Sequence, residues 1–484
     1  MDELFEHQKQ GIAFLKEKKK VILADEMGLG KTRQAIIAAQ EDCEGMTGLK
    51  LIICPASLKI NWQREIKMVV PDAFVQVIES GKEKQIQPIG WVVINYDMLQ
   101  KYRSQLIGLK EAHWVVAGIL DEAHYIKGKK TIRATTALEI VTGLDRVYCL
   151  TGTPVMNRPA EMFNLLRAIS HPLGARKSFY STRYCGGHIQ IIPRRNGQIL
   201  RFWDESGATR LPELRDLTKD SILRRTKDEV LDLPDKIISV ENVKMTNEWK
   251  KVYDEAWENY ISWVEAHPEG KNFENILNAQ ALVEIGKLKQ VCSIAKIKRI
   301  AEDIESAIEQ GEKVIVFSQF TNTIKQIAEE AKKIKIETGM KDGWGKNVMQ
   351  PAGVVTLTGE DNMNARQESV DAFQNEDNVK VFVANIKAGG VGLNLTAATQ
   401  VMFADMDWSP AIHDQATDRA HRIGQNKMVN VRYYVMENTI EEDIVEILQK
   451  KLQTIGQIVD GKAEAEDGTL AGEFLDRLKK RMGI

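Results

Sequence analysis

A glycine-rich string between a strand pattern and a helix pattern constrains the fold of this chain most. Residues 25–32 read Asp-Glu-Met-Gly-Leu-Gly-Lys-Thr, after an apolar run at 21–24 and before a helix-like stretch that opens at Thr32. Backbone N–H groups of such a turn, together with the helix dipole, favour anions. Lys31 can reach the β- and γ-phosphates of a nucleotide, and the Thr32 hydroxyl can bind Mg²⁺. The expected nucleotide-binding residues of this loop are Gly28, Leu29, Gly30, Lys31 and Thr32.

A pair of adjacent carboxylates supplies a partner for this loop. Asp121 and Glu122 follow another apolar run, residues 114–120. A carboxylate at the carboxyl end of a parallel strand can hold Mg²⁺ through its water shell, a role that we assign to Asp121. A second carboxylate beside it can orient and deprotonate an attacking water, which we assign to Glu122. The loop and the acid pair together predict a nucleoside triphosphatase.

Bulk properties limit the class of protein and its partners. The chain has 484 residues, 43% of them hydrophobic, which is ordinary for a globular protein of two or three domains. Its net charge of −2 gives no global attraction to polyanions, so any nucleic-acid contact must be local. The five scattered cysteines indicate reduced thiols, and no apolar run is long enough to span a membrane. We expect no membrane contact and a cytoplasmic protein, nucleoid-associated in a prokaryote or virus and nuclear in a eukaryote.

Short apolar runs alternate with helical patterns in two parts of the chain. This alternation predicts an α/β fold with parallel sheets, each covered on both faces. The runs of the first part are 21–24, 51–54, 91–94, 115–120 and 147–150, and those of the second are 314–317, 353–357, 379–383 and 400–403. Only the first part contains a phosphate loop, which suggests one nucleotide held between two lobes.

The stretches outside this alternation set the expected domain boundaries. Gly, Arg and aromatic residues dominate an irregular insertion of the first lobe, whereas an aromatic stripe at helical spacing begins at Trp249 and favours helix packing over base stacking. The predicted parts are a first lobe at 1–170, its insertion at 171–222, a second lobe at 223–460 with a helical protrusion at about 246–295, and a tail at 461–484 with an amphipathic helix.

The second lobe supplies arginines in the string from Asp414 to Gln425. Arg419 and Arg422 are three residues apart, and we expect them to share a helix face, with Gln415 one turn earlier. Guanidinium groups that reach a nucleotide can neutralise charge developing on the γ-phosphate, an effect of about 10³–10⁵ in rate. We therefore expect Gln415, Arg419 and Arg422 to take part in catalysis.

Small polar and glycine residues at strand ends are candidates for a second set of contacts. Ligands of open α/β sheets bind at the carboxyl ends of the strands, and glycines allow close approach of backbone amides to an anion. Candidate nucleic-acid-binding residues of this kind are Pro55, Ser57, Ser318, Gln319, Lys387, Gly389, Gly390 and Thr396. Trp408 is a further candidate, either against a minor groove or base, or packed under the helix expected at 414–425.

With these residues assembled, the chain resembles helicase superfamily two and, within it, the Snf-type DNA translocases. The strings at 25–32, 121–124, 150–157 and 418–425 match that family's motifs I, II, III and VI in order. The segment Ser-Ile-Leu-Arg-Arg-Thr-Lys at 221–227 looks like the one that joins the two lobes in this family. Features at 183–185 and 403–410 look like the annealing-helicase, HARP-like branch, which remodels branched DNA.

The resemblance implies two RecA-like lobes with helical insertions, and ATP and Mg²⁺ as cofactors. It also implies that Gln8 reads adenine and that duplex or forked DNA is bound without sequence preference and moved by lobe closure. Two alternatives remain open at this point. One is a helicase that separates strands of DNA or RNA. The other is a nucleotide-gated nucleic-acid-binding scaffold without turnover, although such a scaffold would not need Lys31, Asp121, Glu122, Arg419 and Arg422 together.

Overall fold

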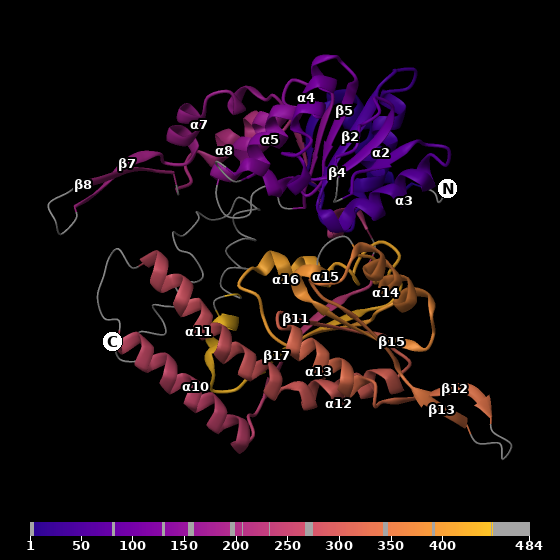
Figure 1. The fold of residues 1–484 in the computed structure, drawn as a ribbon, viewed down its shortest axis with the longest axis vertical. Helices are drawn as coiled ribbons and strands as arrows, with labels where there is room; N and C mark the ends of the chain where they lie inside the picture. The colour runs from indigo at the N-terminus through magenta and orange to yellow at the C-terminus, as the bar shows by residue number, and fades with distance from the viewer. Residues whose placement is uncertain are drawn as a thin grey trace. The chain divides into compact units, whose positions relative to one another are not determined.

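The chain forms two compact units, which divide between residues 232 and 233 in a computed structural model (Figure 1). The described residues are 4–79, 83–127, 131–152, 159–193, 199–205, 207–231, 233–266, 274–341, 347–389, 393–446 and 448. The division falls later than residue 223, where the sequence placed the start of the second lobe. The reason is that a short strand, β9 (Ile222–Leu223), pairs with the phosphate-loop strand of the first unit.

In the described part of the first unit, seven parallel strands form one sheet in the order β3-β4-β2-β5-β6-β1-β9. Their other bounds are β1 Lys20–Leu23, β2 Leu49–Cys54, β3 Val75–Val77, β4 Gly90–Asn95, β5 Val115–Leu120 and β6 Val147–Leu150. The continuous apolar runs predicted as strands are therefore strands, because a sheet covered on both faces buries every residue of each run. All the carboxyl ends of these strands lie at one edge.

Helices cover both faces of this sheet. Helix α1 Glu6–Lys18 precedes β1, and α2 Lys31–Asp42 and α3 Lys59–Val69 follow β1 and β2; those on the other face are α4 Arg103–Glu111, α5 Ile132–Val141 and α6 Met162–Ala168. Figure 1 shows α4 and α5 on one side of the strands and α2 and α3 on the other. One apolar cluster joins alternate strand residues such as Leu51 and Ile53 to Leu106 of α4, Ile140 of α5 and Leu165 of α6. Short 3₁₀ turns in the described ranges are η1 Ala56–Leu58, η2 Tyr96–Met98, η3 Ala123–Ile126, η4 Pro159–Glu161 and η5 Pro172–Gly174.

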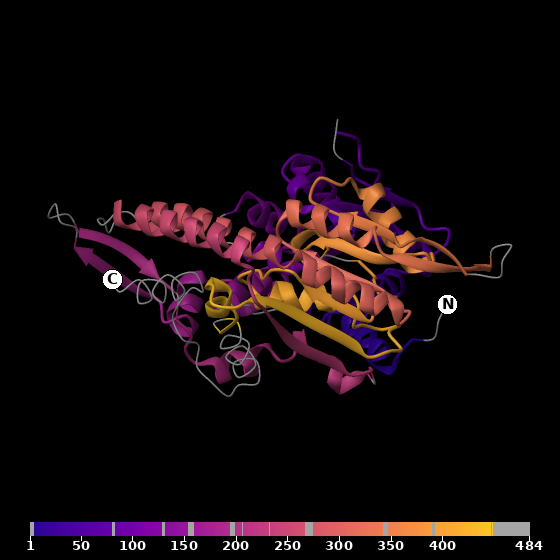
Figure 2. The same cartoon turned by 90° about the horizontal axis from the view of Figure 1, so that it is seen from below.

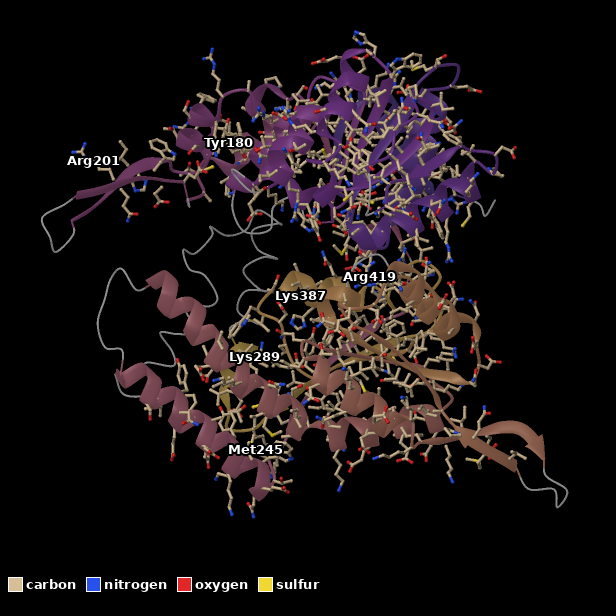
Figure 3. All side chains as sticks on the ribbon, viewed as in Figure 1. Tyr180, Arg201, Met245, Lys289, Lys387 and Arg419 are labelled. Atoms are coloured by element: carbon tan, nitrogen blue, oxygen red, sulfur yellow. The ribbon has the colours of Figure 1, made fainter. Side chains whose placement is uncertain are left out.

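The stretch predicted as an irregular insertion contains regular elements. They are α7 Lys177–Tyr184, the antiparallel hairpin of β7 His188–Pro193 and β8 Ile199–Asp204, and α8 Leu211–Thr218, followed by α9 Lys227–Val230. Figure 3 shows Tyr180 near the base of the hairpin and Arg201 farther along it. Arg183 of α7 binds the Glu213 carboxylate of α8 through two hydrogen bonds of 2.7 Å, which ties the two helices together.

In the described part of the second unit, six parallel strands form a sheet in the order β10-β17-β16-β11-β15-β14. Their bounds are β10 Lys236–Val243, β11 Val314–Ser318, β14 Gly353–Leu357, β15 Val379–Asn385, β16 Gln400–Phe403 and β17 Val429–Met436. Alternate residues of β11 enter two different cores, with Val314 and Val316 on one face and Ile315 and Phe317 on the other. This period of two is the strand geometry that the buried runs predict.

Helices again cover both faces of the second sheet. They are α12 Ile297–Glu309 and α13 Thr321–Ala331 on one face, and α14 Met363–Asn375, α15 Ile386–Gly389 and α16 Pro410–Thr417 on the other. The predicted helical protrusion consists of α10 Asn247–Ala266 and α11 Glu274–Ala295, which lie side by side and extend from the sheet (Figures 1 and 2). Tyr253 and Tyr260 of the aromatic stripe are buried in a core with Ile440, which supports helix packing.

Two further features complete the described chain. A stretch that looks like an insertion in the sequence, about 339–353, overlaps an antiparallel hairpin of β12 Lys335–Lys341 and β13 Asn347–Pro351. The predicted amphipathic helix of the tail lies outside the described residues. Among the helices in the described ranges, none has the length and hydropathy needed to cross a membrane.

Candidate nucleotide site and strand-end surface

The glycine-rich loop leaves β1 and leads directly into α2. Gly28 and Gly30 have φ values of 85° and 73°, a left-handed conformation that is costly for other residues. Gly30 is also the N-cap of α2, so the first amides of the helix face the loop. The loop therefore has the local geometry of a phosphate-binding turn, with two glycines placed where their conformation is required.

The predicted side chains of this loop lie at the start of α2. Lys31 is the first residue of the helix, and its ammonium donates to the carbonyl oxygens of Asp25 at 2.6 Å and Glu26 at 3.0 Å. Thr32 is half-buried in the first helical turn. The Lys31 ammonium is thus held over the residues that open the loop, and the Thr32 hydroxyl belongs to the same turn.

Helix α1 brings a glutamine against the phosphate loop. Gln8 is buried, and its Oε1 accepts a hydrogen bond of 3.2 Å from the backbone amide of Phe5. A Cβ placed on Gly30 would lie 2.4 Å from Nε2 of Gln8, so the glycine also makes room for this side chain. The neighbouring His7 donates from Nε2 to the carbonyl oxygen of Leu29 at 3.2 Å. Burial lowers the pKa of His7, while the bond to the Leu29 carbonyl oxygen acts in the opposite direction.

The Asp121 carboxylate lies at the end of β5, separated from β1 by β6. It accepts hydrogen bonds from Trp62 Nε1 at 2.7 Å and from the amide of Glu122 at 2.9 Å. Burial, with a smaller contribution from Glu122, raises the pKa of Asp121 to about 6, while the Trp62 bond and the charge of Lys31 act in the opposite direction. The charge of Lys31 influences the pKa of Asp121, so these two predicted site residues lie within electrostatic range of each other. Sequence reasoning missed Trp62, because nothing in the sequence relates its helix α3 to Asp121.

Glu122 has a left-handed backbone at the start of η3. Its φ and ψ are 46° and 52°, and a non-glycine residue in this region carries a cost of about 1–3 kcal/mol. Its Oε2 atom lies 3.1 Å from Nδ1 of His124. Backbone strain of this kind concentrates at functional sites, and the catalytic role of Glu122 stays a prediction.

Asp121 and Thr32 are a suitable donor pair for Mg²⁺. A carboxylate and a hydroxyl oxygen suit Mg²⁺, which binds through one or two carboxylates together with phosphate oxygens and water. No group of three or more His, Cys, Asp or Glu side chains in the described ranges is placed to enclose a metal by itself. The donor set therefore fits a magnesium ion that arrives with a nucleotide.

Asp405 organises the strand-end loops of the second unit. Its carboxylate accepts hydrogen bonds from the Ser318 hydroxyl at 2.5 Å, the Ser293 hydroxyl at 2.9 Å and the Gln319 amide at 2.9 Å. Gln319 also donates from its side chain to the carbonyl oxygen of Met406. Ser318 and Gln319 follow β11, Asp405 and Met406 follow β16, and Ser293 belongs to α11. The network fixes both predicted residues, Ser318 and Gln319, against a neighbouring loop.

The loop after β15 joins the same edge. Asn385 donates to the carbonyl oxygen of Gln319 at 3.0 Å and accepts from the Lys387 amide at 3.0 Å. The ammonium of Lys387 is largely exposed and lies 3.2 Å from the buried carboxylate of Asp407. A Cβ on Gly389 would lie 2.8 Å from the Phe317 ring, so this glycine serves packing. Gly390 lies outside the described residues.

The predicted shared helix face of Arg419 and Arg422 is wrong. Helix α16 ends at Thr417, and the chain continues in turns held by bonds such as Ala420 N to Thr417 O at 3.0 Å. Arg419 is buried and donates from Nε to the carbonyl oxygen of Gln415 at 3.1 Å. Arg422 is half-buried and donates to the carbonyl oxygen of Leu393 at 3.2 Å. Figure 3 shows Arg419 and Lys387 at the same end of the second unit.

The remaining candidate residues are placed as follows. The Thr396 hydroxyl accepts from Gln374 at 3.2 Å, and Pro55 and Ser57 lie where β2 passes into η1. Trp408 is half-buried, and the ammonium of Lys289 on α11 lies 4.9 Å from its ring centroid. The same ammonium donates to the Met406 carbonyl oxygen at 2.7 Å. Trp408 therefore lies beside the helical protrusion, a placement that the sequence did not suggest, and its contact with DNA stays a prediction.

Two parallel-sheet units, of which the first has a phosphate loop and an Asp-Glu pair at one sheet edge, define a helicase-type nucleotide-binding chain. Comparison with known families makes this specific. The SNF2-related domain matches residues 7–323 and the helicase conserved C-terminal domain matches residues 295–424. The chain belongs to the SNF2-related family.

The relatives extend the likeness over most of this chain. The "DNA annealing helicase and endonuclease ZRANB3" of Bos taurus is 30% identical over 96% of the chain and 42% of its own length. The "Uncharacterized ATP-dependent helicase MG018" of Mycoplasma genitalium is 32% identical over 94% of the chain and 42% of its own length. The solved structure of the "Sulfolobus solfataricus SWI2/SNF2 ATPase core in complex with dsDNA" is 27% identical, with a TM-score of 0.42 over 95% of this chain and 94% of that one. The chain spans less than half the length of these two curated relatives.

Proposed function

We propose that this chain is a DNA-stimulated ATPase that translocates along double-stranded or branched DNA. The observation that carries the proposal is the edge of the first sheet, where left-handed Gly28 and Gly30 lead into α2 at Lys31 and the buried Asp121 carboxylate follows β5. Family membership supports it, as do the names of the relatives, which include an annealing helicase and an ATP-dependent helicase.

The residues of the first unit have distinct roles in this proposal. Amides of the loop at Gly28 and Gly30 and the ammonium of Lys31 bind the nucleotide phosphates, and Gln8 contacts the adenine. Thr32 and Asp121 hold Mg²⁺, which neutralises charge on the phosphate oxygens. Glu122 orients the attacking water and accepts its proton.

The second unit contributes charge and a DNA surface. We propose that Arg419 and Arg422 stabilise the negative charge that develops on the γ-phosphate, with Gln415 supporting them. Gln319 and the exposed Lys387 of this edge contact DNA phosphates, while Ser318, which is fully buried and donates to Asp405, supports the loop from within. Contacts of an amide and an ammonium with phosphates carry no base information, which fits binding without sequence preference.

The branch of the family is the finer part of the proposal. The resemblance at 183–185 and 403–410 and the name of the Bos taurus relative both favour remodelling of branched DNA. A chain that acts on DNA would be found in the nucleoid of a prokaryote or the nucleus of a eukaryote.

The test compares ATP hydrolysis with duplex, forked and single-stranded DNA and with RNA. We expect forked and duplex DNA to stimulate turnover most, and Lys31→Ala to abolish hydrolysis while the folded state persists. Stimulation by single strands or RNA alone would instead favour a strand-separating helicase. Absence of turnover with every polynucleotide, together with ATP-dependent DNA binding, would favour the scaffold.

A further inference from the structure

Arg225 binds three separate parts of the nucleotide site. Its guanidinium donates to both carboxylate oxygens of Asp25, with Nε 2.9 Å from Oδ1 and Nη2 2.5 Å from Oδ2. Nη1 donates to the carbonyl oxygen of His7, and Nη2 lies 3.2 Å from Oε1 of Gln34. Asp25 and Gln34 are fully buried and Arg225 is 8% exposed, so these bonds are shielded from water. One side chain thus joins helix α1, the start of the phosphate loop and helix α2.

Each partner of Arg225 touches a residue that handles the nucleotide. The backbone carbonyl of Asp25 accepts from the Lys31 ammonium at 2.6 Å. Gln34 donates to the Leu29 carbonyl oxygen within the loop at 3.0 Å. His7 directly precedes Gln8, which contacts Gly30 of the loop. The Arg225 fork therefore sets the mutual placement of the groups expected to contact adenine and phosphates.

A glycine leaves room for this cluster. Gly11 lies in the middle of α1, where alanine would be the better helix former. A Cβ at Gly11 would come within 1.8 Å of Gln34 Oε1 and 2.8 Å of Arg225 Nη2. Its lack of a side chain is therefore explained by the polar cluster rather than by the helix.

Arg225 also lies on the segment that leads out of the first unit. It follows β9, whose Leu223 pairs with Leu23 of the phosphate-loop strand. The backbone of Glu26 donates to the Arg225 carbonyl oxygen at 2.9 Å, and the Lys227 amide donates to the Glu26 carboxylate at 2.8 Å. The second unit begins at Leu233, so the residues that open the phosphate loop are bonded to the connecting chain itself.

We propose that Arg225 is a positioning residue for the nucleotide site, which holds the phosphate loop in its binding geometry and ties it to the connection between units. It would act through Asp25, Gln34 and the His7 carbonyl group and would not touch the nucleotide. The inference rests on the proposed function for its biological meaning, but its test needs neither turnover nor DNA.

The test is the affinity of the full chain for a fluorescent ATP analogue with Mg²⁺. Arg225→Lys keeps the charge but has no planar fork to reach all three partners. We expect about tenfold weaker binding, the effect of losing one charge-assisted hydrogen bond. The matched control is Arg183→Lys, which removes the two-bond pair with Glu213 in the same unit and should change the affinity less than about twofold.

Thermal unfolding separates positioning from a merely structural role. At a temperature where both variants are folded, equal analogue affinity in wild type and Arg225→Lys overturns the inference, even if the variant melts earlier. If Arg225→Lys does not fold, Gly11→Ala takes its place, because it disturbs the cluster without removing a charge. Weaker analogue binding by folded Gly11→Ala supports the inference, and unchanged binding overturns it. If wild type binds the analogue but never hydrolyses ATP, the proposed function fails while this result stands.

Discussion

The carboxyl edges of the two sheets are built from similar elements but are tied together differently. In the first unit, the glycine loop keeps its amides at a helix start, and the Lys31 ammonium donates to the backbone carbonyl oxygens of Asp25 and Glu26. In the second unit, Asp405 gathers Ser318, Ser293 and the Gln319 amide into one network. One edge is arranged to receive a compact anion, whereas the other presents a fixed set of polar groups. Similar α/β scaffolds therefore differ at their carboxyl edges through the bonding of their loops.

The largest effect on kcat is expected for Arg422 of the second unit, which we propose stabilises charge on the γ-phosphate. Arg422→Ala should lower kcat of DNA-stimulated hydrolysis by about 10³–10⁵ and leave the KM for ATP nearly unchanged, because an arginine finger acts on the transition state. Steady-state kinetics at saturating DNA measure both constants. Arg432→Ala, on β17 of the same unit, is the control and should behave like wild type. A raised KM with preserved kcat would refute the finger role.

A smaller loss of kcat is expected when Glu122, the proposed general base in the first unit, is changed. Glu122→Gln should reduce kcat by about 10²–10⁴, since the amide cannot accept the proton of the attacking water. Binding of an ATP analogue should persist, because the phosphate loop is untouched. Glu161→Gln, also in the first unit, provides the comparison. If Glu122→Gln hydrolyses ATP at the wild-type rate, Glu122 is not the general base.

The bonding network of the second edge should matter for DNA and not for ATP. Asp405→Asn replaces one accepting oxygen with an NH₂ group, so the loop that carries Ser318 and Gln319 loses a charge-assisted bond. We expect about tenfold weaker binding of duplex DNA in a fluorescence-anisotropy titration, with unchanged affinity for the ATP analogue. Asp371→Asn on α14 is the matched control. Equal DNA affinity in wild type and Asp405→Asn would show that the network is not part of the DNA surface.

The smallest effect concerns acid stability of the second unit. Burial lowers the pKa of His413, which donates from Nε2 to the Asp407 carbonyl oxygen at 3.0 Å. The unfolded chain therefore binds a proton that the folded chain does not, so stability falls as the pH drops below about 6.5. His413→Phe should weaken that fall by up to about 1.4 kcal/mol per pH unit in urea titrations at about pH 5 and pH 7. The exposed His188, changed to Gln, should leave the slope as it is.

The sequence was sufficient for most strands of the two sheets, but not for β3, β9, β10 and β17 or for the contacts between distant residues. The strands at 115–120 and 147–150 occur where their apolar runs predict them, because burial on both faces imposes an unbroken pattern. The end of α16 before Arg419 was missed, since no glycine or proline marks that position. The bond from Trp62 to Asp121 spans 59 residues and the pair of Asp25 with Arg225 spans 200. Such partners follow from strand order, which local patterns do not encode.

The strict phosphate-loop pattern has glycine at the position of Asp25. The bond from Arg225 explains why an aspartate stands there, and it has a consequence for biosynthesis. The carboxylate is wholly buried, yet the guanidinium that neutralises it is synthesised 200 residues later. At about 5–20 residues per second, a growing chain waits roughly 10–40 seconds between the two. The nucleotide site therefore cannot reach its final form until nearly all of the first unit has left the ribosome. A premature stop before residue 225 would leave the Asp25 carboxylate without this guanidinium partner.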